Sequence, residues 1–251
     1  MNFPSVSIVI TAFKRPRQLE RTLDSIRSQK YQGDLEIIIT EHGSDGNTDR
    51  IARDFGAKYT SVPRTDLPAF QNPARIHNIG IRAATKDIVI LQGAEVKYTG
   101  TNDIANLTAP LVEDRFAVRS ACVRAMDHLG GFEEWYSHPT EGRRAGWIVN
   151  FCLAVHRNLL LRIQGFEESI TGYGYEDDFL MFCLRKAGGQ VDYVTTVTAE
   201  HQWHDRSSYV FYEGFTGAGS PGHVRLEQLF ADVQSGAIAP VANVGKEWGR
   251  K

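Results

Sequence analysis

The sequence lacks several features that would assign it to a specialised class of protein. Only three cysteines occur among its 251 residues, Cys122, Cys152 and Cys183, and no two of them form a CxxC pair. Because the three cysteines are few, widely spaced and flanked by apolar residues, they are interpreted as buried free thiols, and neither a disulfide framework nor a zinc knuckle is expected. Apolar runs are short as well, and none approaches the roughly 20 residues that a membrane-spanning helix requires.

Charge of one sign is also missing. The chain has 28 Lys and Arg residues against 30 Asp and Glu residues, a formal net charge of −2. Such a balance gives no overall attraction to nucleic acid or to an anionic membrane. The amino-terminal stretch MNFPSVSIVIT lacks the length and the basic flank of a secretory signal. We therefore expect a soluble, cytoplasmic protein with no membrane span.

Two common nucleotide-binding motifs are absent from the loop after the first predicted strand. Neither GxxxxGK[ST] nor GxGxxG occurs there, so a P-loop and a Rossmann dinucleotide site are not supported. A nucleotidyltransferase that makes nucleotide sugars would need a glycine-rich, basic loop at this place. The segment TAFKRPRQ is basic but contains no glycine.

The first hundred residues do show a regular alternation of strands and helices. In residues 15–29, Leu19, Leu23 and Ile26 recur at spacings of four and three, which is typical of an amphipathic helix. Strands are predicted at residues 5–13, 35–40, 57–63 and 86–96, and helices at 15–29, 48–56 and 72–85. This order predicts an α/β fold with a central, mostly parallel sheet covered by helices on both faces.

After residue 100 the pattern is less regular, but no repeat or linker divides the chain. Strands are predicted at residues 116–126, 147–157 and 190–203, and helices at 157–166, 177–189 and 224–236. We predict a single domain, 1–251, with a first lobe at 1–97 and a second lobe at 98–206. The remainder, 207–251, is predicted to be a mobile glycine-rich loop and a C-terminal helix. That loop is interpreted either as a lid over a bound ligand or as an ordinary loop.

Polar residues follow three of the predicted strands, at residues 11–15, 41–45 and 93–95. In open α/β sheets, ligands bind beyond the carboxyl ends of the strands. The three segments are therefore expected to converge on one crevice.

Three adjacent carboxylates, Glu176, Asp177 and Asp178, follow a turn that contains Gly172 and Gly174. One interpretation is structural, because the dipole of a helix favours negative charge in its first turn. The other is chemical: one carboxylate is a general base that takes the proton of a hydroxyl nucleophile. Local sequence leaves both open. The tyrosines of the turn, Tyr173 and Tyr175, suit either simple packing or stacking on a sugar ring.

A second group of residues suits a metal ion. His201 and His204 lie three positions apart at the end of a predicted strand, and Glu95 ends another. Two imidazoles and a carboxylate together can ligate a divalent cation, although each alone is commonly a surface or packed residue. Arg15 and Arg75 are surface charges in one interpretation. In the other, they bind a diphosphate, which a guanidinium can hold through two hydrogen bonds.

These segments together resemble a known enzyme family. VSIVITAFKRP, LEIIITEHGSDGNTDRIARDFG and NPARIHNIGIRAATKDIVILQGAEV resemble the nucleotide-binding half of family 2 GT-A glycosyltransferases. NLLLRIQGFEESITGYGYEDDFLMFCLRKAG resembles the acceptor-side segment of the β-1,4-galactosyltransferases, in which a glycine–aromatic–glycine run leads into Glu-Asp. The resemblance covers residues 5–206, and it implies a nucleotide-sugar-binding lobe at 1–97 and an acceptor and metal lobe at 98–206. It implies a GT-A fold and a metal-dependent, inverting transfer of a sugar from a nucleoside-diphosphate donor, most simply a UDP-sugar, to an acceptor hydroxyl.

The resemblance also implies a role for each candidate residue. The nucleotide sugar would contact Thr11, Ala12, Arg15, Glu41, Arg75 and Glu95. The metal, Mn²⁺ with Mg²⁺ as the alternative, would be bound by Glu95, His201 and His204. The acceptor, a carbohydrate or another hydroxyl-bearing molecule, would contact Tyr173, Glu176 and Asp178, and Asp177 would be the catalytic base.

Two departures from the family pattern leave alternatives open. Gly93-Ala94-Glu95 stands where the family has Asp-X-Asp, and Glu41-His42 stands where it has an acidic pair. A degenerate module that binds a nucleotide sugar or a glycan without turning it over would fit these changes. A glycosyltransferase acting on modified nucleic acid is a further alternative. Arg143, Arg144 and Arg206 could line its groove, but the net charge gives it no support.

Overall fold

The computed structural model describes residues 3–44, 46–63, 72–143, 145–148, 150–172, 174–204 and 218–250. Its strands are β1 (Val6–Ala12), β2 (Leu35–His42), β3 (Lys58–Val62), β4 (Ile88–Gly93), β5 (Val96–Tyr98), β6 (Ala117–Met126), β7 (Phe132–Ser137), β8 (Cys152–His156) and β9 (Gln190–His201). Its helices are α1 (Pro16–Arg27), α2 (Asn47–Asp54), α3 (Ala74–Ala83), α4 (Asp103–Glu113), α5 (Arg157–Arg162), α6 (Glu176–Lys186) and α7 (Pro221–Gln234).

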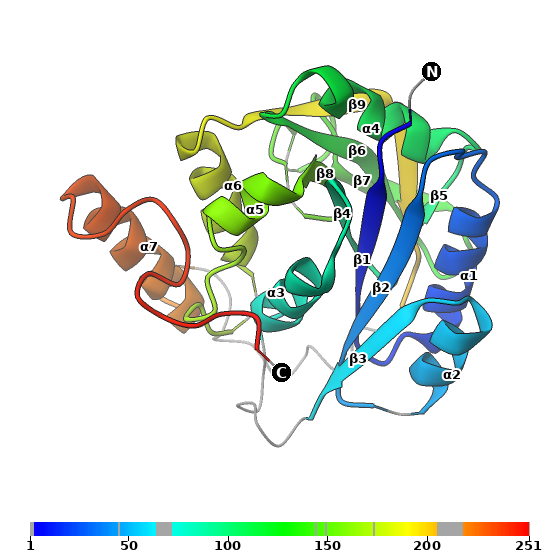
Figure 1. Ribbon diagram of the computed structural model, residues 1–251, viewed down its shortest axis with the longest axis horizontal. Helices are drawn as coiled ribbons and strands as arrows, with labels where there is room; N and C mark the ends of the chain where they lie inside the picture. Colours follow the sequence, from blue (N-terminus) through cyan, green and yellow to red (C-terminus); the bar gives the residue numbers. More distant parts are fainter. Residues whose placement is uncertain are drawn as a thin grey trace.

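The strands form one sheet in the order β3-β2-β1-β4-β8-β6-β9-β5, with β7 paired to β6 (Figure 1). Strands β1 to β4 are parallel as predicted, because β1 runs parallel to β2 and β4, and β2 runs parallel to β3. Beyond β4 the sheet is mixed. β8 is antiparallel to both of its neighbours, and β9 is parallel to β6 but antiparallel to β5. The predicted α/β architecture is confirmed.

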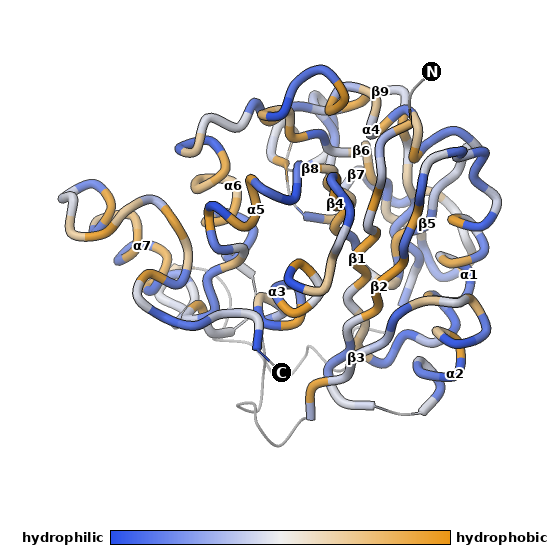
Figure 2. The backbone as a smooth tube through the Cα atoms, viewed as in Figure 1, coloured by the Kyte–Doolittle hydropathy of each residue, from blue (hydrophilic) through white to orange (hydrophobic). Residues whose placement is uncertain are grey.

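Alternation along the strands creates an apolar core on each face of the sheet. Ile8 and Ile10 of β1 pack with α1, α2 and α4, whereas Val9 points to the other face and packs with α3, α5 and α6. All three are fully buried. Figure 1 shows α1 and α2 on one side of β1 and β2, with α3, α5, α6 and α7 on the other. Figure 2 shows the hydrophobic stretches that run along these strands.

Some elements differ from the sequence prediction. The strand predicted at 147–157 begins only at Cys152, since Asn150 and Phe151 form a turn directly before it. Helix α4 was not predicted because Pro110 lies inside it, and proline disfavours a helix interior. Its buried face, which includes Leu107 and Leu111, packs against the sheet and outweighs that local preference.

Helix α3 lies unusually close to the sheet at Gly80. A Cβ atom at this position would lie 2.3 Å from Cγ1 of Val9 in β1, so only glycine permits the approach. The close approach holds α3, and the residues just before it, beside the carboxyl ends of the parallel strands. Within the described ranges, none of the helices combines the length and the hydropathy that crossing a membrane would require.

Candidate active site

The pairing of β5 with β9 creates a cluster of metal-ligand side chains. Glu95 lies in the two-residue turn between β4 and β5, and the next residue, Val96, is the register partner of His201. The backbone N–H of Gln202 then donates to the carbonyl of Glu95 at 2.8 Å. Ligand atoms of Glu95, His201 and His204 all lie within 4.8 Å of one another. The three residues predicted to hold the metal are therefore brought together.

The electrostatics of the cluster suit a cation. Burial opposes ionisation of Glu95, but the hydrogen bond from His201 and the positive charge of Arg15 outweigh it, so its pKa is lowered to about 2. Nε2 of His201 lies 3.4 Å from Oε1 of Glu95, and both imidazoles are buried. An ionised carboxylate with two imidazoles is a donor set that fits a divalent cation such as Mn²⁺.

The position of Glu95 depends on the glycine that replaces the first aspartate of the Asp-X-Asp pattern. A Cβ atom on Gly93 would lie 3.0 Å from Cδ and Oε1 of Glu95 and 3.2 Å from Oε2. The longer carboxylate of Glu95 thus lies over the space that a side chain at position 93 would fill. Because Gly93 has no side chain, there is room beside it for the carboxylate of Glu95, which is one methylene longer than that of an aspartate.

Arg15 joins the end of β1 to this cluster. Its Nη2 lies 2.9 Å from Nδ1 of His204, and the side chain is buried. A guanidinium has no acceptor, so it donates and Nδ1 of His204 accepts. A neutral imidazole has one unprotonated nitrogen, and this hydrogen bond uses it. A metal bound to His204 needs that same lone pair, so the metal and Arg15 compete for His204.

The remaining residues predicted to bind nucleotide lie at the same level of the sheet. Thr11 is the register partner of Gly93, and Ala12 is that of Glu41. The carboxylate of Glu41 is buried and accepts from Thr48 Oγ1 at 2.7 Å and from the Tyr59 hydroxyl at 2.6 Å.

Arg75 has a different environment. Its Nε donates to the carbonyl of Arg250 at 3.3 Å, which directs this side chain toward the carboxyl-terminal segment. Arg15, by contrast, contacts the metal-ligand cluster through its hydrogen bond to His204. No described contact brings Arg75 to the metal ligands.

The acidic triplet forms the first turn of α6, and its three carboxylates differ in environment. Glu176 is buried and accepts from Nδ2 of Asn72 at 2.7 Å, and burial, followed by the charge of Asp178, raises its pKa. Asp178 accepts from Nε1 of Trp147 at 2.9 Å. Asp177 lies between them and is partly exposed. Tyr173, predicted to contact the acceptor, lies outside the described residues.

Asn72 connects the acidic triplet and the turn before it with helix α3. Besides Glu176, its Nδ2 lies 3.2 Å from the carbonyl of Gly172 and 3.1 Å from that of Gly174. Its Oδ1 accepts from the backbone N–H of Ala74 at the start of α3. The turn before α6, where Gly172, Gly174 and Tyr175 all have positive φ, is thus fastened to α3.

Two polar residues of the site were not found from the sequence. His77 of α3 and Asn150, just before β8, lie with Nε2 and Nδ2 3.2 Å apart. Burial, with a smaller effect from His42, lowers the pKa of His77 to about 3, and the charge of Glu95 partly offsets this. Neither residue belongs to a motif or to a polar run after a strand, so no local pattern points to them.

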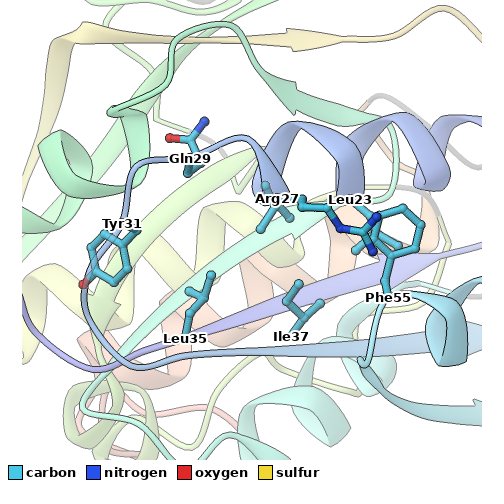
Figure 3. Close-up of a pocket in the computed structure, with 8 residues that line it drawn as sticks. Leu23, Arg27, Gln29, Tyr31, Leu35, Ile37 and Phe55 are labelled. Atoms are coloured by element: carbon cyan, nitrogen blue, oxygen red, sulfur yellow. The ribbon is translucent and has the colours of Figure 1, made fainter.

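A separate pocket of about 270 Å³ lies between α1 and β2 (Figure 3). Leu35 and Ile37 line it from the first half of β2, whereas Glu41 lies near the end of that strand. The guanidinium of Arg27 lies 4.0 Å from the centre of the Phe55 ring at its edge. This pocket is therefore at the opposite end of the strand from the candidate site.

Comparisons with known proteins agree with this fold. The chain is similar to GalNAc-T7, solved with UDP, GalNAc and Mn²⁺, with a TM-score of 0.68 and 16% identity over 90% of this chain and 48% of that one. It is also similar to a mannosyltransferase from Pyrobaculum calidifontis, solved with GDP-Man and Mn²⁺, with a TM-score of 0.62 and 17% identity over 96% and 72% of the two chains. The protein has the GT-A glycosyltransferase fold.

Sequence comparison identifies the family. The profile described as Glycosyl transferase family 2 matches residues 7–165, which is more than half of the 251 residues. An N-acetylglucosaminyltransferase from Rhizobium sp. (strain N33) is 28% identical over 116 residues, or 45% of this chain and 25% of that protein. The chain thus spans about a quarter of the length of this relative. The protein belongs to glycosyltransferase family 2.

Proposed function

We propose that the protein is a metal-dependent, inverting glycosyltransferase that moves a sugar from a UDP-sugar to the hydroxyl of a carbohydrate acceptor. The observation that carries the proposal is the cluster of Glu95, His201 and His204 at the carboxyl ends of the strands. In open α/β folds this is where ligands bind. Mn²⁺ in the structures of two similar proteins supports a divalent metal here.

The residues of the donor side would act by binding and by charge. When bound, the metal supplies positive charge that stabilises the departing diphosphate. Glu95, His201 and His204 would hold it. Arg15, displaced from His204 by the metal, would be free to donate to a phosphate oxygen. Thr11 and Ala12 would contact the nucleotide, and Glu41 would contact its base or ribose. The contact of Arg75 with the nucleotide sugar stays a prediction.

The acceptor side would supply the base. In this proposal Asp177 takes the proton of the attacking hydroxyl, on the face of the sugar opposite the diphosphate, so that the anomeric configuration inverts. Glu176 and Asp178, fixed by Asn72 and Trp147, would contact other hydroxyls of the acceptor. The resemblance of the GYGYEDD segment to the β-1,4-galactosyltransferases supports these roles.

Chelation gives a direct test. Treatment with EDTA is expected to abolish release of the nucleoside diphosphate from its nucleotide sugar, and added Mn²⁺ is expected to restore it, because the metal held by the cluster would stabilise the negative charge of the departing diphosphate. The measurement is turnover of UDP-sugars and, as comparison, GDP-mannose, with and without metal. Full turnover in EDTA would contradict the metal requirement. Donor binding without any turnover would instead identify a binding module, the alternative that the missing aspartate at Gly93 favours.

Removal of Arg15 is expected to tighten metal binding. If Arg15 and Mn²⁺ compete for the lone pair on His204, Arg15→Ala should lower the Kd for Mn²⁺ by about 10-fold in the absence of nucleotide. That factor corresponds to ~1.5 kcal/mol, typical of a hydrogen bond to a charged group. Isothermal titration with Mn²⁺ measures it.

The matched control is Arg17→Ala, at an exposed position of α1, which should leave the Kd unchanged. Weaker Mn²⁺ binding by the Arg15 variant would contradict the competition, since it would mean that Arg15 supports the metal rather than excluding it. The same variant should bind UDP more weakly once Mn²⁺ is present, because a phosphate contact has been lost.

A further inference from the structure

Two side chains next to the candidate metal site carry hydrogen-bonding atoms that the described part of the protein leaves unused. His77 is 6% exposed and Asn150 is 7% exposed, and they contact each other through Nε2 and Nδ2 at 3.2 Å. Nδ1 of His77 and Oδ1 of Asn150 are buried and have no hydrogen-bond partner in that part of the chain. Unsatisfied buried polar atoms are rare and destabilising in native proteins, so this adjacent pair needs an explanation.

The pair lies on the wall of the site. Asn150 precedes Phe151, whose ring meets that of His201 edge-on, with 5.5 Å between ring centres. His77 comes from α3, the helix held against the sheet, and it lies near enough to Glu95 for that charge to affect its pKa. The pair therefore adjoins the candidate metal site through Phe151 and α3, and neither side chain belongs to the Glu95–His201–His204 cluster.

The chemistry of the pair indicates what it binds. If Asn150 donates through Nδ2 to Nε2 of His77, then His77 keeps a free N–H at Nδ1 and Asn150 keeps a free carbonyl oxygen. If the side-chain amide of Asn150 is flipped, Nε2 of His77 donates to Oδ1 of Asn150. The unused groups are then the amide N–H of Asn150 and the unprotonated Nδ1 of His77. Either way, the two side chains together keep one unused donor and one unused acceptor. A diphosphate oxygen can only accept, whereas a hydroxyl group does both.

We propose that His77 and Asn150 form a subsite for hydroxyl groups of the sugar that the donor carries. This inference rests on the proposed function, because it assumes that a nucleotide sugar occupies the site. A sugar hydroxyl would donate to the free acceptor of the pair and accept from its free donor. The pair would then discriminate among donors by the position of their hydroxyl groups, since a misplaced hydroxyl would leave the buried polar atoms unpaired.

The test separates the affinity for the sugar from the affinity for the nucleotide. Asn150→Leu replaces the amide with an apolar group of similar size, and His77→Phe keeps the stacking of this ring on Phe166, 4.6 Å away. Titration calorimetry with Mn²⁺ compares UDP and GDP with UDP-glucose, UDP-galactose, UDP-N-acetylglucosamine and GDP-mannose. For the sugar that the wild type prefers, each variant should bind the nucleotide sugar about 10-fold more weakly and bind the free nucleoside diphosphate unchanged.

Asn106→Leu, at an exposed position of α4, is the matched control and should leave all these affinities unchanged. If the variants bind the nucleoside diphosphate and the nucleotide sugar with equally weakened affinity, or with unchanged affinity for both, the proposed subsite is wrong. A fall in melting temperature with unchanged sugar affinity would also overturn it, since the pair would then be structural, for example bridged by a buried water. If the wild type binds no nucleotide at all, the proposed function itself fails, and this is seen before any variant is made.

Discussion

Replacing Asp177 with Asn is expected to lower the rate of sugar transfer by about 10²–10⁴-fold, the usual contribution of a general base. The side chain lies in the first turn of α6 between Glu176, which is hydrogen-bonded to Asn72, and Asp178, which is hydrogen-bonded to Trp147. Asn has the same shape but cannot accept the proton of the attacking hydroxyl. The loss should therefore appear in kcat, measured as release of the nucleoside diphosphate at saturating donor.

Donor binding should survive the change, because in the proposed mechanism Asp177 contacts only the acceptor. Titration with UDP and Mn²⁺ should give the same Kd for the variant and the wild type. The matched control is Asp49→Asn, which changes a first-turn aspartate of α2 that forms an ion pair with Arg53. An Asp177→Asn enzyme with unimpaired turnover would exclude Asp177 as the base.

Removing the carboxylate of Glu95 should weaken Mn²⁺ binding by about 100-fold or more. Even residues that only orient a metal ligand commonly contribute 10- to 100-fold in affinity, and Glu95 supplies the negative charge of the proposed ligand set. Its low pKa, about 2, means that the carboxylate stays ionised and available through the neutral range. Glu95→Ala should bind Mn²⁺ weakly in a direct titration, whereas Glu113→Ala, exposed on α4, should match the wild type.

Gly93→Ala tests the same geometry without removing a ligand. Gly93 does not have a positive φ, so alanine fits the backbone, but its methyl group would lie 3.0 Å from the Glu95 carboxylate. The carboxylate would have to shift, and we expect Mn²⁺ affinity to fall by about 10-fold, within the range seen when a ligand is misaligned. Unchanged affinity in both Gly93→Ala and Glu95→Ala would place the metal elsewhere or remove it from the proposal.

The elements of the first hundred residues could be predicted because their signals are local. The β-branched run that ends at Ala12 and the spacing of Leu19, Leu23 and Ile26 each indicate one element without reference to the rest of the chain. Parallel pairing followed from the alternation of strands and helices. Helix α4 was missed because Pro110 contradicts it locally, and only packing of its apolar face against the sheet overrides that preference.

The candidate site was predictable in part for a similar reason. Glu95 and His204 follow strands, His201 ends one, and the resemblance to known glycosyltransferases supplied their grouping. Residue type and order thus fixed which side chains could ligate a metal. They could not exclude the structural interpretation of each one, because a glutamate or a histidine after a strand is commonly just solvated.

Tertiary structure alone decided how these residues meet. The register of β5 on β9 sets His201 beside Glu95, and shifting it by one residue would turn the side chains of the strand to the other face. Three-dimensional packing also placed Arg15 on His204 and joined His77 to Asn150. Sequence determined the elements and the chemistry at their ends, since both depend on neighbours along the chain. Contacts between distant segments depend on register and close packing, which no local pattern encodes.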